Sequence, residues 1–235
     1  MQVYISQEPL SGIILWQYGY VTRSACLKAA TGRHGGGNSR VAPGKRSNYG
    51  GGLVTGNGHL ILIVPIGPVD AETLKALASA LRDVFRLPVK RGRMLQIPPE
   101  AYNDERRQYN SSVILDMLKT LRSADFCRML AVIDEDLYVP RLNFVFGMAD
   151  MESGVAIISL VRLRNENYGY PPDNRLLFER TVKEAVHELG HTFGRGHCAD
   201  PRCVMHFSNS LEDTDQKGSS FCPNCRGRSG MEWYF

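Results

Sequence analysis

Residues 187–197 of the 235-residue chain read HELGHTFGRGH, a stretch with three histidines, one glutamate and three glycines. On an α-helix, His187 and His191 lie four positions apart, so both imidazoles project from one face and can reach one ion. Glu188 is rotated by about 100° around the helix and can stand beside a metal without binding it. Gly194 can adopt the positive φ that ends a helix, so the chain can turn back and bring His197 as a third nitrogen ligand.

Three neutral imidazoles with an open fourth position are typical of a catalytic zinc site. The alternative is a helix whose histidines only form surface hydrogen bonds, which does not account for the glycine and the third histidine. Met205 follows eight residues after His197. A methionine is often core filler, but here it predicts a Met-turn that forms an apolar floor beneath the metal. His206 is a possible fourth ligand, although a closed site would lose its water.

Four cysteines form a second pattern, with four residues between the first pair and two between the second: Cys198, Cys203, Cys222 and Cys225. Paired short spacings suit a closed, tetrahedral, structural zinc site, and disulfides are the weaker alternative in a reducing compartment. This zinc would hold the C-terminal tail and, through the neighbouring backbone, His197. Cys26 and Cys127 stand alone and are expected to be inert thiols.

The run HExxHxxGxxHC, followed by CxM and CxxC, resembles the archaemetzincin family of zinc metallopeptidases. Similar segments extend upstream: Ile63–Gly67, Gln108–Ser111, Asp136–Pro140 and Leu142–Gly147. The resemblance covers residues 59–235 and implies a compact, metzincin-like zincin fold. It also implies two zinc ions, with His187, His191 and His197 on the catalytic one, Glu188 as the base, and the four cysteines on the other. Residues 1–58 lie outside it, and Arg195 replaces a small or apolar residue.

Hydrophobic periodicity predicts an α/β (α+β) layout with a mixed sheet, an active-site helix and a zinc-pinned C-terminal subdomain. The expected strands are Leu60–Val64, stopped by Pro65, then Leu87–Val89, Met129–Ile133, Phe144–Phe146 and Val155–Leu163. One helix is expected after the cap Asp70, with Leu74, Leu77, Leu81, Val84 and Phe85 on its core face. A second begins at Ser111 or Ser112 with Ile114, Leu115, Leu118 and Leu121 inside, and a third follows Asp173 or Asn174. Little regular structure is expected after Gly194, and Asp213–Gly218 is expected to be a polar loop.

Composition divides the chain near residue 58. Residues 1–58 hold six basic residues, one acid and 12 of the 23 glycines, which predicts a disordered extension or, alternatively, a basic arm for an acidic partner. Residues 59–235 are expected to form the metallopeptidase domain. No apolar run is long enough to cross a bilayer and the N-terminus does not resemble a secretory signal. We therefore expect a cytoplasmic monomer with no membrane or nucleic-acid partner.

Together these patterns predict hydrolysis of peptide bonds by a zinc-bound water with Glu188 as general base. A peptide or protein substrate would lie extended beside an edge strand near Asn143–Gly147. One alternative is a zinc-stabilised peptide-binding or regulatory protein with little turnover. Another is a nucleic-acid module, but only Arg226 and Arg228 flank the last cysteine pair and no aromatic residues interleave with them.

Overall fold

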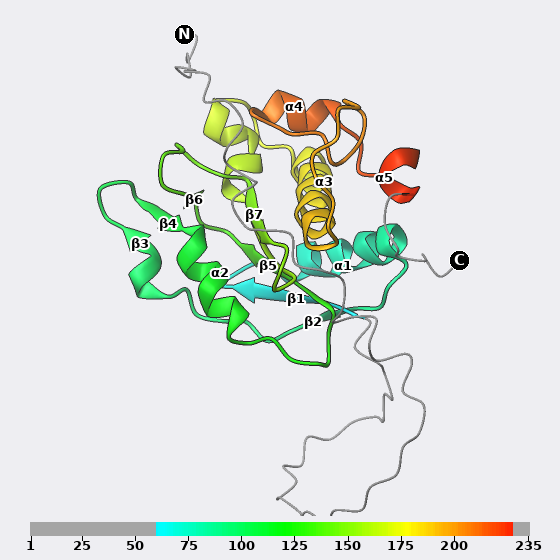
Figure 1. The fold of residues 1–235 in the computed structure, drawn as a ribbon. Coiled ribbons are helices and arrows are strands. Elements are labelled where there is room, and N and C mark those ends of the chain that lie inside the picture. Colours follow the sequence, from blue (N-terminus) through cyan, green and yellow to red (C-terminus); the bar gives the residue numbers. More distant parts are fainter. Residues whose placement is uncertain (1–59, 228–235) are drawn as a thin grey trace, which may run out of the picture. The chain divides into compact units, whose positions relative to one another are not determined.

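A five-stranded mixed sheet forms the centre of the computed structural model, which describes residues 60–227. The strand order is β2-β1-β5-β8-β7, and the first four strands are parallel whereas β7 is antiparallel to β8 (Figure 1). The bounds are β1 Ile61–Ile66, β2 Val89–Arg91, β5 Arg128–Ile133, β7 Gly147–Asp150 and β8 Val155–Ser159. The expected mixed α/β sheet is therefore confirmed. The extension over residues 1–58 and Cys26 lie outside the described residues.

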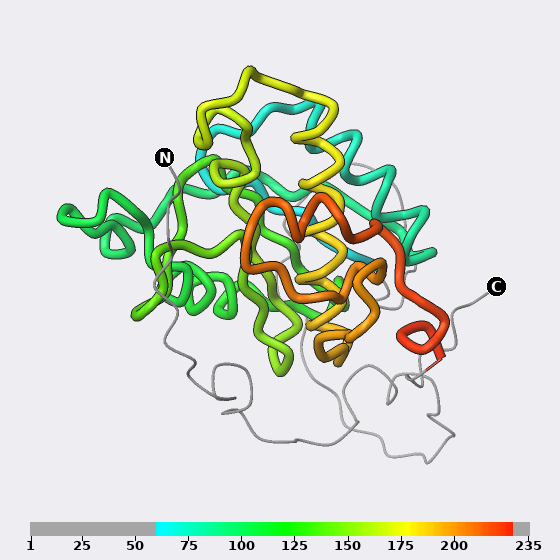
Figure 2. The backbone as a smooth tube through the Cα atoms, turned by 90° about the horizontal axis from the view of Figure 1, so that it is seen from above, coloured from blue at the N-terminus to red at the C-terminus, as the bar shows by residue number. Residues whose placement is uncertain are grey.

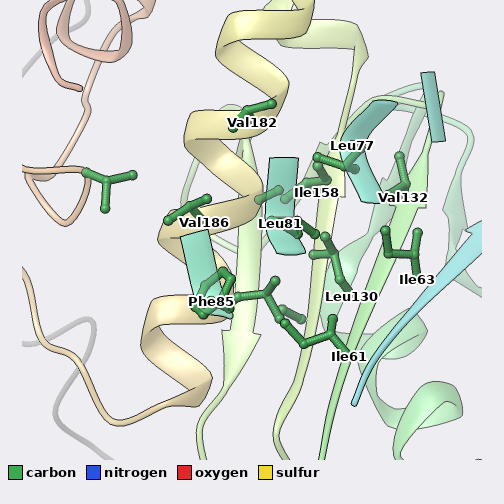
Figure 3. Packing of buried hydrophobic residues seen from close by; sticks show 14 of the residues in the cluster. Ile61, Ile63, Leu77, Leu81, Phe85, Leu130, Val132, Ile158, Val182 and Val186 are labelled. Carbon is green, nitrogen blue, oxygen red and sulfur yellow. The ribbon is translucent and has the colours of Figure 1, made fainter. Parts of the chain in front are cut away.

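Three helices sandwich this sheet. The long helices α1 (Ala71–Phe85) and α3 (Asn174–Thr192) pack on one face, and α2 (Ser111–Lys119) packs on the other. Successive residues of a strand point to opposite faces of the sheet, so each strand contributes alternate side chains to the hydrophobic core on either face. Ile61 and Ile63, for example, face α1 and α3 (Figure 3), whereas Val64 and Ile66 face the α2 side. The face that carries α3 is the one that positions the site.

Smaller elements flank the main sheet. A second sheet has the order β3-β4-β6, and its strands are β3 Tyr102–Asn103, β4 Gln108–Asn110 and β6 Leu137–Tyr138. Short 3₁₀ turns span Pro99–Ala101, Val161–Leu163 and Asn165–Tyr168. Two short helices, α4 (Leu211–Gln216) and α5 (Pro223–Gly227), follow α3. Within residues 60–227, no helix combines the length and apolar character that crossing a membrane requires.

Helix caps follow the local sequence closely. Asp70 accepts a hydrogen bond from the Thr73 amide at 2.7 Å, and this bond is the main cause that lowers the pKa of Asp70. Asp173 likewise accepts from the Leu176 amide at 2.8 Å and begins α3 as expected. The expected core face of α1 is buried except for Val84, which is partly buried. Helix α2 begins at Ser111 as expected, with Asn110 as its cap, and Leu121 is exposed because the helix ends at Lys119.

Three strand predictions need correction. Strand β1 continues through Pro65, whose carbonyl accepts from the Leu95 amide at 2.9 Å. The backbone carbonyl of Pro65 thus points away from β5, toward the side where β2 has already ended. Proline has no N–H, and at this position the missing N–H costs no hydrogen bond to β5. Strand β2 begins at Val89 and not at Leu87. Strand β8 ends at Ser159, whose hydroxyl accepts from the Val161 amide at 3.2 Å and leads the chain into a 3₁₀ turn.

Two further segments also differ from expectation. Phe144–Phe146 is not a strand, because Phe144 and Phe146 pack in a separate cluster with Leu163 and Leu211. The tail beyond Gly194 is more regular than expected, since α4 overlaps the predicted loop Asp213–Gly218. A capping box explains this helix: the Ser210 hydroxyl accepts from the Asp213 amide, and the Asp213 carboxylate accepts from the Ser210 amide.

Candidate metal centre

The last two turns of α3 and the turn after it bring three histidines together. His187 and His191 are buried, and Gly194, with φ 80°, ends the helix with its amide bonded to the His191 carbonyl at 2.8 Å. The chain then turns back to His197. One ring nitrogen from each of the three side chains lies within 4.8 Å of the others. The structure therefore brings together the three residues that the spacing predicts as ligands.

Hydrogen bonds determine which nitrogen of each ring can bind a cation. His187 Nδ1 lies 2.8 Å from the Val204 carbonyl and His191 Nδ1 lies 2.7 Å from the Arg195 carbonyl. A carbonyl can only accept, so both Nδ1 atoms donate and both Nε2 atoms carry lone pairs. These two Nε2 atoms lie 3.1 Å apart with no proton to share. A cation between them removes this repulsion, and the spacing is close to the roughly 3.3 Å expected for two nitrogens at tetrahedral zinc.

Desolvation keeps these imidazoles neutral, which is the form that ligates a metal. Desolvation lowers the pKa of His187 well below its ordinary value and, to a smaller degree, lowers the pKa of His191. His197 is exposed to solvent on one side, and partial desolvation among its neighbours, followed by the charge of His191, lowers its pKa to about 4. The donor set therefore fits a divalent, nitrogen-binding metal such as zinc.

Glu188 lies deep beside this group, with 7% of its surface exposed. Burial, followed by the negative charge of Glu184, raises its pKa to about 8. A bound cation would lower that pKa again, because an opposite charge favours the carboxylate. The side chain of Glu188 packs against the α-carbon region of Gly147, the first residue of the edge strand β7.

Met205 packs against α3, whereas its neighbour His206 points to the loop at Cys198. Met205 is fully buried, and its thioether lies against α3 at Gly190, where it would collide with any side chain. The Met-turn stays a prediction, which this packing against α3 favours. His206 does not join the three-histidine group, since its Nδ1 lies 3.0 Å from the Cys198 carbonyl. The expectation of a possible fourth ligand is therefore not supported by the geometry.

The four cysteines converge at the start of α5. Their sulfur atoms all lie within 4.8 Å of one another, and Cys198 Sγ is 3.8 Å from Cys222 Sγ. A disulfide requires about 2.0 Å, whereas 3.8 Å is close to the edge of a tetrahedron with zinc–sulfur bonds of about 2.3 Å. The Cys225 amide is the main cause that lowers the pKa of Cys222 to about 7. Cys127 is buried and lies outside this group.

Arg195 occupies the helix end without displacing these ligands. It is 5% exposed, its amide donates to the Gly190 carbonyl at 3.0 Å, and its own carbonyl orients His191. Burial lowers the pKa of its guanidinium, and the negative charge of Cys225 opposes that shift.

An ion pair that sequence reasoning missed lies behind the histidines. Lys217 Nζ is 2.9 Å from Glu184 Oε1, and the two side chains are 0% and 4% exposed. Glu184 lies one helical turn before Glu188, so the two share a face of α3. That spacing was the available signal, but nothing local in the sequence pairs Glu184 with a lysine 33 positions later.

Known proteins share both this sequence pattern and this fold. The model of Peptidase family M54 matches residues 80–229. This chain belongs to peptidase family M54. Among curated relatives, the archaemetzincin of Pyrococcus abyssi is 44% identical over 173 residues, which cover 71% of this chain and 92% of the relative. The archaemetzincin of Methanocaldococcus jannaschii is 44% identical, covering 70% and 89% respectively.

Solved structures agree with this assignment. The zinc-dependent peptidase of Methanocorpusculum labreanum is 34% identical with a TM-score of 0.65, over 71% of this chain and 97% of that chain. The archaemetzincin of Archaeoglobus fulgidus, complexed with malonate, is 39% identical with a TM-score of 0.62, over 71% and 98%. The predicted archaemetzincin resemblance and fold are thus confirmed. The M54 chain is a metallopeptidase of a zinc-dependent family, and its substrates are peptides or proteins.

Proposed function

We propose that this M54 peptidase cleaves peptide bonds at a zinc ion held by His187, His191 and His197, with Glu188 as general base. The observation that carries the proposal is that the Nε2 atoms of His187 and His191, each with a lone pair, lie 3.1 Å apart, with the buried Glu188 next to His187. When bound, zinc supplies a Lewis acid that polarises the scissile carbonyl and acidifies water. The carbonyls of Val204 and Arg195 hold the two helical imidazoles in the tautomer that ligates.

Glu188 moves the proton in this proposal. It takes a proton from the attacking water and delivers it to the leaving amine. Its position supports this role, because the side chain is buried on α3 directly after His187 and would lie beside a water bound at the three histidines. Met205 forms the apolar floor under the histidines.

A second zinc on Cys198, Cys203, Cys222 and Cys225 would have a structural role. Four sulfur atoms within 4.8 Å of one another would occupy all four positions of a tetrahedral zinc ion and leave none for water. Because Cys198 follows His197 directly, this site would hold the third histidine in place, and its binding energy would contribute to folding.

The substrate is proposed to lie along the free edge of β7. Just before β7, the Phe146 carbonyl accepts from the Ser159 amide at 2.8 Å, and the first pair of the ladder is Gly147 with Ile158. Hydrogen-bonded and non-hydrogen-bonded pairs alternate in an antiparallel ladder, so the main-chain groups of Gly147 and Ala149 point away from β8. An extended peptide could pair with them as an added strand. The sequence-based expectation of Asn143–Gly147 thus moves to Gly147–Asp150.

The test is Glu188→Gln beside the control Glu179→Gln, which alters an exposed glutamate on the same helix. Both variants should keep the wild-type zinc content and melting temperature. Only Glu188→Gln should lose turnover, by about 10²–10⁴-fold, the range typical of a lost general base. Full cleavage by Glu188→Gln would show that another group takes the proton.

A further inference from the structure

Gly147 has no room for a side chain. A β-carbon built there would lie 2.6 Å from Glu188 Cγ, 3.0 Å from Glu188 Cδ and 2.8 Å from the Ile157 carbonyl. Gly147 does not have a positive φ, so its backbone conformation is open to any residue. The need for glycine at this position therefore comes from the space that the neighbouring groups occupy.

The two faces and the edge of β7 have different surroundings at this point. Gly147 and Ala149 face α3, and both are small, whereas Met148 points to the opposite face and packs with the α2 core. The main-chain groups of Gly147 point to the free edge of the sheet. Gly147 thus contacts the Glu188 side chain on one face of the sheet, and its own N–H and C=O point to the free edge of the sheet.

We infer that Gly147 is the positioning residue that seats Glu188 beside the substrate strand. The inference rests on the proposed role of Glu188. The absence of a side chain lets Glu188 lie directly on the edge strand, which sets the distance between its carboxylate and a peptide paired with β7. An ordinary contact begins at 3.4 Å, so a methyl group at 2.6 Å would require Glu188 to shift by about 0.8 Å (3.4 − 2.6). A misplacement of about 1 Å can cost a reaction roughly 100-fold in rate.

The first experiment compares Gly147→Ala with Gly92→Ala. Gly92 lies at the opposite edge of the sheet, also without a positive φ, and a β-carbon there would meet nothing closer than 3.4 Å. We expect Gly147→Ala to keep its zinc and to lose kcat by about 10–100-fold. Its KM should change by less than about threefold, because a misplaced base affects the chemical step and not substrate binding. Gly92→Ala should resemble the wild type, and equal kinetics for the two variants would overturn the inference.

The second experiment separates the contact with Glu188 from the contact with Ile157. Unfolding is measured for Gly147→Ala, Glu188→Ala and the double variant, which together form a double-mutant cycle. Removal of Glu188 Cγ should recover part of the stability lost in Gly147→Ala. An unchanged loss, or failure of both Gly147 variants to fold, would assign the collision to the Ile157 carbonyl and refute the inference. Folding of the double variant alone would support it.

The two proposals fail in distinguishable ways. If Glu188→Gln retains full cleavage, the general-base proposal is wrong whatever Gly147 does, and the unfolding cycle still reports whether Gly147 seats this side chain. If Glu188→Gln loses cleavage while Gly147→Ala matches Gly92→Ala, the base stands and the positioning role of Gly147 is wrong.

Discussion

At the scale of single residues, Gly190 shows how closely Met205 and Phe221 approach helix α3. A β-carbon at Gly190 would overlap Met205 Sδ and lie 3.1 Å from a ring carbon of Phe221. Both neighbours are buried, and buried side chains are close-packed with few voids to move into. Glycine in the middle of a helix costs about 1 kcal/mol relative to alanine, so this close packing offsets an unfavourable local preference.

Gly190→Ala should therefore destabilise the protein although alanine favours helices. Overpacking of this kind costs about 1–3 kcal/mol in the free energy of unfolding. Urea denaturation can measure the loss, with Gly196→Ala as the control because a β-carbon there meets nothing within 4 Å. Replacing Met205 with alanine in the Gly190→Ala background should recover part of the loss. A Gly190→Ala variant as stable as the control would contradict the close packing of Met205.

At the scale of elements, the buried ion pair joins α3 to the end of α4. Glu184 belongs to α3 and Lys217 directly follows α4. Both side chains are buried, so water does not solvate either charge. Figure 2 shows the C-terminal segment, orange to red, running past the yellow α3. Removing only one partner of such a buried pair strongly destabilises the fold, because the other charge is left buried and uncompensated.

Lys217→Met should thus lower the free energy of unfolding by about 3–5 kcal/mol. The double variant Glu184→Leu/Lys217→Met should be clearly more stable than this single variant, since it removes both charges. Thermal or urea unfolding of both variants is the measurement. Lys75→Met serves as the control, because Lys75 and its partner Glu72 are both largely exposed and such a change is usually worth less than about 0.5 kcal/mol. A double variant that is no more stable than the single one would mean that packing, and not charge, dominates.

At the scale of the whole molecule, loss of either of the two proposed zinc sites should affect the protein in a different way. Elemental analysis of the purified protein should give close to two zinc ions per chain. Cys222→Ser should retain close to one and should unfold at a lower temperature, because zinc binding at the cysteines contributes to folding. Peptide cleavage should then fall as well, since His197 is covalently next to Cys198. The control is Cys127→Ser, a buried cysteine outside the four-cysteine group, which should keep both zinc ions. Unchanged zinc content in Cys222→Ser would rule out the structural site.

The division of the chain near residue 58 leads to another prediction for the whole molecule. Deleting residues 1–57 should leave the melting temperature, the zinc content and the cleavage rate nearly unchanged. The reason is the composition of that segment, which is rich in glycine and lacks a hydrophobic pattern. Size-exclusion chromatography of the truncated and full-length proteins would show in addition whether both are monomers. Loss of soluble protein on truncation would show that the segment packs against the domain.

The sequence alone determined whatever depends on neighbouring positions. Helical geometry converts a spacing of four into a shared face, so the spacing by itself puts His187 and His191 on one side of α3. The same local rules placed the caps Asp70 and Asp173 and the core face of α1. The capping box at Ser210 and Asp213 is a local signal too, but the polar composition around it favours a loop over a helix.

The tertiary structure decided which distant segments meet. Pro65 remains in a strand because β2 ends before reaching it, and Phe144–Phe146 forms no strand because its phenylalanines pack in a separate apolar cluster. Glu188 meets Gly147 across 41 positions (188 − 147), and Glu184 meets Lys217 across 33 (217 − 184). A local pattern reports which face of an element is apolar, but not which partner will cover it. That choice depends on how all the layers pack together, so these contacts exist only in the folded chain.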